Sequence, residues 1–177
     1  MPKEILLDSN KIQIILSRLV CQLIENHNDF KNTVLIGLQP RGVYLFDQII
    51  KIFKENYPNL EFDSGKLDFT FFRDDFRRSE KTLSANSTDI NFSIENKKVV
   101  FIDDVLFTGR SIKAAMTSID TYGRPNSIEL LVLVDRRFKR EMPIEPNYCG
   151  VKIDTLMGDK VKVEWSNLGK NIVFIEN

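Results

Sequence analysis

Two adjacent carboxylates, Asp103 and Asp104, follow directly after an apolar run at residues 99–102, and a Thr-Gly-Arg-Ser turn at 108–111 comes shortly afterwards. Helical periodicity begins at this turn, and a helix N-terminus presents free N–H groups and a positive dipole end that suit a phosphate. Gly109 lets the backbone approach an anion closely, and the carboxylates can accept hydrogen bonds from sugar hydroxyls. The stretch therefore predicts a cradle for a ribose 5-phosphate.

Each of these features also has an ordinary structural explanation. The two aspartates could cap a loop, and the turn could be a plain helix start. Their combination after a buried strand favours a binding site over that explanation. The stretch is neither a P-loop nor a dinucleotide fingerprint, because the patterns GxxxxGK[ST] and GxGxxG are both absent.

Alternating strands and helices must position this turn. Short apolar runs predict buried strands and 3.6-residue periodicity predicts helices. The expected strands are 33–38, 67–72, 99–102, 127–134 and 172–175, and the expected helices are 10–28, 42–56 and 109–122. This order predicts a single α/β domain over 1–177, with a central, mainly parallel sheet flanked by helices. Ligands of such sheets bind beyond the carboxyl ends of the strands, where loops 37–42 and 103–111 lie.

Composition narrows the functional classes. The chain has 177 residues, 42% of them hydrophobic and 28% charged, which indicates one globular domain and excludes a disordered or fibrous protein. Its 25 basic and 25 acidic residues balance, so bulk charge does not draw it to nucleic acid, although a local basic patch stays open. No apolar run is long enough to span a membrane, no signal peptide is apparent, and two cysteines without a CxxC motif favour the cytosol.

The stretch 99–111 resembles the phosphoribosyl pyrophosphate (PRPP) motif of type I phosphoribosyltransferases. Residues 37–42, Gly-Leu-Gln-Pro-Arg-Gly, look like the pyrophosphate loop of that superfamily, although Pro40 stands where Thr is usual. Phe72-Arg73-Asp74-Asp75, Gly123-Arg124-Pro125 and Val132-Leu133-Val134-Asp135-Arg136 are similar, in order and spacing, to the PyrR branch. Members of that branch combine uracil phosphoribosyltransferase activity with regulation of pyrimidine genes through RNA.

The resemblance implies a role for each matching residue. Asp103 and Asp104 would hold the ribose hydroxyls and indirectly help to place Mg²⁺, while Arg41 would take the pyrophosphate. A polar loop at about 73–96 would close over PRPP. The implied phosphate-binding set is Pro40, Gly42, Arg73, Val105, Leu106, Phe107, Thr108, Gly109, Arg110 and Ser111.

The base would bind under a small hood formed mainly by residues 136–165 and the N-terminal segment. Asp135 and Arg136 would contact the base, and the backbone near Lys160 and Val161 would read its edge. Similar purine enzymes carry Asp at position 107, so Phe107 favours a pyrimidine, uracil, giving UMP. A purine phosphoribosyltransferase stays an alternative.

A second alternative is an RNA-binding transcriptional attenuator with weak or no catalysis. The first helix keeps Arg18 but has Ile14, Ser17 and Cys21 where the branch is commonly rich in Arg, with Thr and His, which lowers this reading. Arg137 replaces a Gly of the hood. Two basic clusters stand out, and each could also be a plain solvated face. The loop cluster could attract phosphate, and the hood cluster could bind the base or RNA: Arg73, Arg77, Arg78 and Lys81 in the loop, and Arg136, Arg137, Lys139 and Arg140 in the hood.

Three further expectations concern isolated residues and assembly. His27, the only histidine, is expected at a solvated helix end, and Cys21 and Cys149 are expected to be unreactive thiols. The resemblance implies a homodimer or homotetramer, with the first helix as a possible contact.

Overall fold

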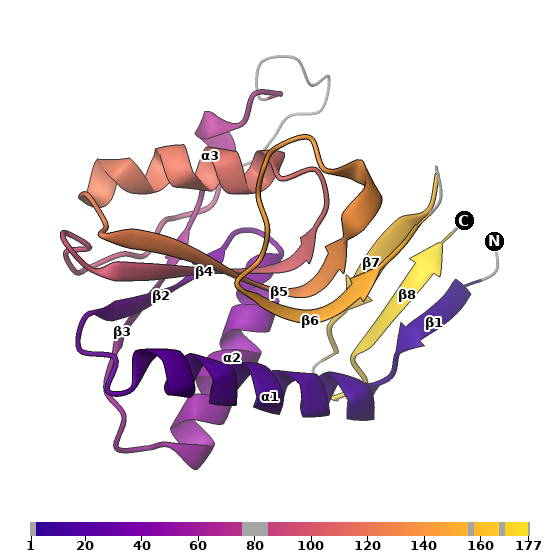
Figure 1. Ribbon diagram of the computed structural model, residues 1–177, viewed down its shortest axis with the longest axis horizontal. Coiled ribbons are helices and arrows are strands. Elements are labelled where there is room, and N and C mark those ends of the chain that lie inside the picture. Colours follow the sequence, from indigo (N-terminus) through magenta and orange to yellow (C-terminus); the bar gives the residue numbers. More distant parts are fainter. Residues whose placement is uncertain (1–2, 76–84, 156–157, 167–168, 177) are drawn as a thin grey trace.

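The computed structural model describes residues 3–75, 85–155, 158–166 and 169–176 (Figure 1). Its main sheet has five strands in the order β3-β2-β4-β5-β6, and every pair in it is parallel. The strands are β2 (Thr33–Leu38), β3 (Asp63–Leu67), β4 (Lys98–Leu106), β5 (Ser127–Arg136) and β6 (Tyr148–Ile153). The predicted α/β class with a central parallel sheet is confirmed.

Helices cover both faces of this sheet (Figure 1). They are α1 (Ser9–His27), α2 (Gly42–Asn56) and α3 (Arg110–Ile119), with short 3₁₀ turns η1 (Thr70–Phe72), η2 (Asp120–Tyr122) and η3 (Arg137–Lys139). Leu35, Val100 and Ile102 pack toward α1 and α2, while Val34, Ile36 and Phe101 pack toward α3. Each buried side chain of this size contributes about 1.5–3 kcal/mol. The central strands are therefore apolar on both faces, as the sequence predicted.

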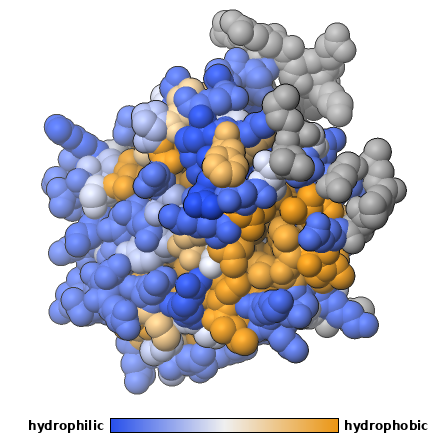
Figure 2. Space-filling model, turned by 45° about the vertical axis from the view of Figure 1, so that its right-hand side comes forward, coloured by the Kyte–Doolittle hydropathy of each residue, from blue (hydrophilic) through white to orange (hydrophobic). Residues whose placement is uncertain are grey.

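A second, antiparallel sheet lies beside the main one, with the order β1-β8-β7. Its strands are β1 (Lys3–Leu7), β7 (Lys160–Glu164) and β8 (Ile172–Glu176), so it joins the two ends of the described chain. Residues 148–153, inside the range predicted for the hood, pair with β5 in the main sheet instead. Figure 2 brings the side of the small sheet forward and shows an apolar area there; Ile5 of β1 and Ile14 of α1 are 61% and 70% exposed.

The predicted strand at 67–72 is wrong. The strand is Asp63–Leu67, a polar stretch that pairs in parallel with β2, and Thr70–Phe72 form the turn η1. Gly65 explains the choice, because a Cβ there would lie 2.4 Å from the carbonyl oxygen of Asp89. Backbone pairing and close approach, rather than apolar periodicity, decide this edge strand.

The expectation of a solvated His27 is also wrong. Its imidazole is buried at the end of α1 and contacts three side chains: Thr33 Oγ1 at Nδ1, and Glu129 Oε2 and Tyr148 Oη at Nε2, each at 3.0 Å. Burial is the main influence on its pKa, which is lowered. His27 therefore fastens α1 to strands β2, β5 and β6 at the end of the sheet opposite the predicted site.

Candidate active site

A cleft of about 240 Å³ opens at the carboxyl end of β4, against the start of α3. Its lining residues are Arg73, Asp74, Asp75, Asp103 and residues 105–112. Every residue of the predicted phosphate-binding set from Val105 to Ser111 therefore lines one cleft, and Arg73 lines it as well. The cleft lies where parallel α/β sheets bind their ligands.

The turn at residues 107–111, just before and at the start of α3, lines this cleft throughout. Gly109 has a φ of 88° and immediately precedes α3, so the chain enters the helix through a left-handed conformation that favours glycine. A Cβ on Gly109 would lie 3.0 Å from Cβ of Met142. The Arg110 N–H points to Oγ1 of Thr108 at 3.3 Å. The turn thus combines a helix N-terminus with hydroxyls, as an oxyanion site requires.

The two aspartates lie on opposite faces of β4, as successive strand residues must. Asp103 lines the cleft and accepts a 2.9 Å hydrogen bond at Oδ1 from the main-chain N–H of Asp104. Burial, and next the charge of Asp104, raise the pKa of Asp103 well above its usual range. Only Asp103 therefore faces the cleft directly.

Asp104 is buried on the other face and pairs with Arg41. Arg41 Nε donates to Oδ2 of Asp104 at 3.1 Å, and its NH2 donates to the carbonyl of Val163 in β7 at 3.1 Å. Arg41 precedes α2, after a cis Gln39–Pro40 peptide. A hollow of about 420 Å³ lies along this side, lined by Pro40, Arg41, Tyr44, Val163, Glu164 and Trp165. Arg41 thus lines a second concavity, and Asp104 is its buried ion-pair partner.

Gly42 allows this arrangement. A Cβ there would lie 2.5 Å from the carbonyl oxygen of Ile102 and 2.9 Å from Oδ1 of Asp103. The first turn of α2 therefore packs directly against the end of β4.

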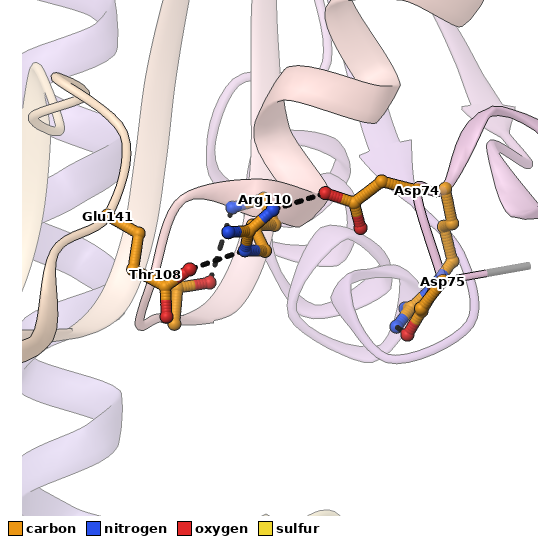
Figure 3. A network of polar contacts seen from close by, with 6 residues as sticks. Asp74, Asp75, Thr108, Arg110 and Glu141 are labelled. Atoms are coloured by element: carbon orange, nitrogen blue, oxygen red, sulfur yellow. Dashed lines mark hydrogen bonds and ion pairs between the residues drawn. The ribbon is translucent and has the colours of Figure 1, made fainter. Parts of the chain in front are cut away.

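Arg110 links the two sides of the cleft (Figure 3). Its guanidinium pairs with Asp74, which follows η1, and with Glu141, which follows η3. Arg73 makes two hydrogen bonds to Asp75, at 2.8 and 2.7 Å. In the described chain, the cations at the mouth of the cleft are therefore balanced by carboxylates.

The segment after β5 is fastened to the same turn. The N–H groups of Glu141 and Met142 both donate to the Thr108 carbonyl, at 2.9 and 3.0 Å. Arg140 donates to the Phe107 carbonyl and pairs with the buried carboxylate of Asp135. The turn that can hold a phosphate and the predicted hood therefore form one connected unit.

Phe107 itself is covered by Arg136, the last residue of β5. The guanidinium carbon lies 3.9 Å from the centre of the Phe107 ring, which is a cation–π contact. Burial lowers the pKa of Arg136, and the nearby charge of Asp159 acts in the opposite direction.

Comparison with known proteins agrees with this geometry. The family model for the phosphoribosyl transferase domain matches residues 3–166. The chain belongs to the phosphoribosyltransferase family. Within it, the chain is 37% identical over 164 residues to the bifunctional protein PyrR of Enterococcus faecalis, covering 93% of this chain and 90% of the relative. It is 41% identical over 165 residues to the PyrR of Gloeothece citriformis, covering 92% of each.

Solved phosphoribosyltransferases share the fold. A hypoxanthine phosphoribosyltransferase from Staphylococcus aureus matches with a TM-score of 0.66 and 26% identity, over 87% of this chain and 80% of that one. The hypoxanthine phosphoribosyltransferase of Trypanosoma cruzi matches with a TM-score of 0.69 over 98% of this chain and 91% of that one, at 16% identity. The second likeness supports the architecture alone.

The residues predicted to contact the base are brought together only in part. In this phosphoribosyltransferase Asp135 is buried and paired with Arg140, while Lys160 and Val161 open β7 of the small sheet. Arg136 reaches that segment, because its NH2 donates to the carbonyl of Asp159 at 2.9 Å. Part of the predicted loop, with Arg77, Arg78 and Lys81, lies outside the described residues.

Sequence reasoning passed over several residues of the site. Asp74 and Asp75 were noted only as part of a motif, and Glu141 and Thr155 had no assigned role. Ion-pair partners of this kind are separated by 31–36 residues from Arg110, so no local pattern indicates them. Of the hood cations, Arg137 makes two hydrogen bonds to Asp154, at 2.7 and 2.6 Å.

Two negative findings apply to the described ranges. No helix there is sufficiently long and apolar to cross a membrane. No three His, Cys, Asp or Glu side chains gather there as a ready-made metal cage. Mg²⁺ is commonly held by one or two carboxylates together with substrate phosphates, and Asp103, which lines the cleft, offers one such carboxylate.

Proposed function

We propose that the chain transfers the ribose 5-phosphate of PRPP to uracil, giving UMP and pyrophosphate. The observation that carries this proposal is the joint placement of Asp103 and the Gly109 turn in one cleft at the end of β4. A bound ribose 5-phosphate would then have its hydroxyls beside the Asp103 carboxylate and its phosphate beside the turn. The family match supports the same transfer.

The reaction displaces pyrophosphate from C1 of PRPP by N1 of uracil. The C1–N1 bond forms, the C1–O bond to pyrophosphate breaks, and the N1 proton is lost to solvent. Asp103 would accept hydrogen bonds from the ribose hydroxyls, and the amides at 107–111 with Thr108 and Ser111 would hold the 5′-phosphate. Arg41, 56% exposed, would meet the departing pyrophosphate. Catalysis would then come mainly from positioning the substrates and from stabilising the negative charge of the departing pyrophosphate.

Mg²⁺ would enter with PRPP. When bound, it would neutralise charge on the pyrophosphate and aid its departure. Asp103 and Asp104 would help to place it, chiefly through the ribose and water rather than as a full protein cage.

The aromatic side chain at position 107 supports a pyrimidine base. Phe107 cannot protonate a purine ring, as an Asp at this place would, and its ring face is occupied by the Arg136 guanidinium. A test measures pyrophosphate release from PRPP with uracil, hypoxanthine or guanine. We expect uracil to be strongly preferred; faster turnover with a purine would contradict the assignment.

RNA binding is the second candidate, favoured by the name of the relatives, bifunctional protein PyrR. Of the residues noted on the first helix, Arg18 is committed elsewhere, because its NH2 donates to the carbonyls of Cys149 and Gly150 at 3.1 and 2.6 Å. A gel shift with an RNA hairpin at rising salt would test this candidate, since phosphate contacts weaken steeply with salt. Complexes that weaken with salt and depend on the RNA sequence would support it, and the absence of any shift at low salt would contradict it.

Association and location complete the proposal. We expect a homodimer or homotetramer, and the exposed Ile14 on α1 agrees with a contact through the first helix. Light scattering after gel filtration would test it, with a monomer as the contrary result. Cys21 and Cys149 are both free thiols, which fits our assignment to the reducing cytosol.

A further inference from the structure

We propose that Thr155 is a positioning residue for base recognition, acting through Arg136. This inference rests on the proposed transfer to uracil and deepens it. Arg136 is the only arginine with a buried side chain among the described residues. The contacts of Arg136 explain how its buried guanidinium is stabilised and which segments it connects.

Three residues fix the Arg136 guanidinium. Thr155 Oγ1 accepts from both Nε and NH2 of Arg136, at 3.2 and 3.0 Å. The same NH2 also donates to the carbonyl of Asp159 at 2.9 Å. The Arg136 guanidinium also lies over the ring of Phe107. The two hydrogen-bonding oxygens are neutral, and the charge of Asp159 acts on the guanidinium from nearby.

These contacts connect two parts of the site that are far apart in the sequence. Phe107 lines the cleft, and its own carbonyl accepts from Arg140. Asp159 directly precedes Lys160 and Val161, the segment assigned to the edge of the base. Arg136 therefore sets the position of that segment relative to the turn that holds the phosphate. Thr155 is 9% exposed and in turn sets the position of Arg136.

The chemistry also selects a kind of base. Arginine has donors and no acceptors, so a guanidinium held in this place favours bases that offer carbonyl oxygens over those that offer amino groups. Uracil offers two carbonyls, whereas cytosine has an amino group at C4.

The test compares Thr155→Val, which removes the hydroxyl at nearly constant volume, with Thr155→Ser, which keeps it. We expect Thr155→Val to raise KM for uracil about tenfold, because bonds to charged groups are strong, while KM for PRPP changes less than about twofold. Thr155→Ser should restore KM for uracil to within about threefold of the wild-type value. Thr33→Val is the matched control, since it removes another buried hydroxyl at His27 and should leave both KM values unchanged.

Three results would overturn the proposal: unchanged uracil KM in Thr155→Val, equal rises of both KM values, or no recovery in Thr155→Ser. Thr155→Ala serves as a second variant without the hydroxyl, and thermal unfolding checks that each variant is folded. If neither variant folds, Thr155 is structural and the proposal is wrong. If the unchanged chain turns over no uracil at all, the proposed function itself fails, which is a distinguishable outcome.

Discussion

The Nε of Arg41 donates a hydrogen bond to Oδ2 of Asp104 across 3.1 Å, joining the start of α2 to the buried face of β4. The NH2 of the same side chain reaches the Val163 carbonyl in β7. One guanidinium thus joins the main sheet, a helix and the small sheet beside the cleft.

Replacing Arg41 by Lys tests this link. A single ammonium cannot reproduce the planar fork that spans Asp104 and Val163. We expect KM for PRPP to rise about tenfold or more, with little loss of stability because the Arg41 side chain is 56% exposed. Steady-state kinetics at saturating uracil measure the change. Arg124→Lys, an exposed site before β5, is the control, and equal kinetics of the two variants would refute the role of Arg41.

Gly109 provides a test of the phosphate turn. Alanine there must adopt a φ of 88° and would approach Met142, so Gly109→Ala should cost about 1–2 kcal/mol of unfolding free energy and weaken PRPP binding. Gly169→Ala has a similar φ of 74° but no neighbour within 4 Å, so it isolates the backbone cost. Urea unfolding and PRPP titration measure both. Unchanged PRPP affinity in Gly109→Ala would show that the turn does not bind the phosphate.

Much of the fold could be predicted because the central strands carry apolar residues on both faces. Residues 33–38 and 99–102 fall in β2 and β4, and the carboxylates come where β4 passes the end of its partner β2. The cleft residues 105–111 could be predicted because they are contiguous in the sequence and follow directly after β4's apolar run. The edge strand Asp63–Leu67 could not, because hydrogen bonding to β2 and the closeness of Gly65 to Asp89 determine it.

Side-chain contacts between residues far apart in the sequence could not be predicted either. His27 looked solvated among polar neighbours, yet its partners Glu129 and Tyr148 come from strands more than a hundred residues later. The stacking of Arg136 on Phe107 likewise depends on how β5 lies beside β4.

His27 makes a direct prediction about pH. Because burial lowers its pKa, the unfolded chain binds more protons than the folded chain just below the usual value of 6.5. Stability should therefore be complete above about pH 6.5 and fall as the pH drops toward the folded pKa. As the only histidine, it gives one imidazole NMR signal, whose midpoint we expect below 6.5. A midpoint above 6.5 would mean that ion pairing with Glu129 outweighs burial.

The Arg110 link should matter little for stability. Arg110, Asp74 and Glu141 side chains are each about half exposed, so solvent screens their attraction. We expect Glu141→Gln to lower Tm less than Gly109→Ala does, and the difference from the unchanged chain to shrink at high salt. Glu55→Gln, which loses an exposed pair with Lys51, is the control. A large, salt-independent loss would instead show that the Glu141 contact supports the fold.

The central claim is that Asp103, at the end of β4, holds the ribose of PRPP, with Asp104 supporting the site from the opposite face of the strand. Its most direct test is pyrophosphate release from PRPP and uracil, with Mg²⁺, by the unchanged chain and by the double variant Asp103→Asn, Asp104→Asn. We predict that the double variant remains folded and loses turnover by about 100-fold or more, a loss of the size seen when one stabilising group of an active site is removed. Full turnover in the folded double variant would contradict the account.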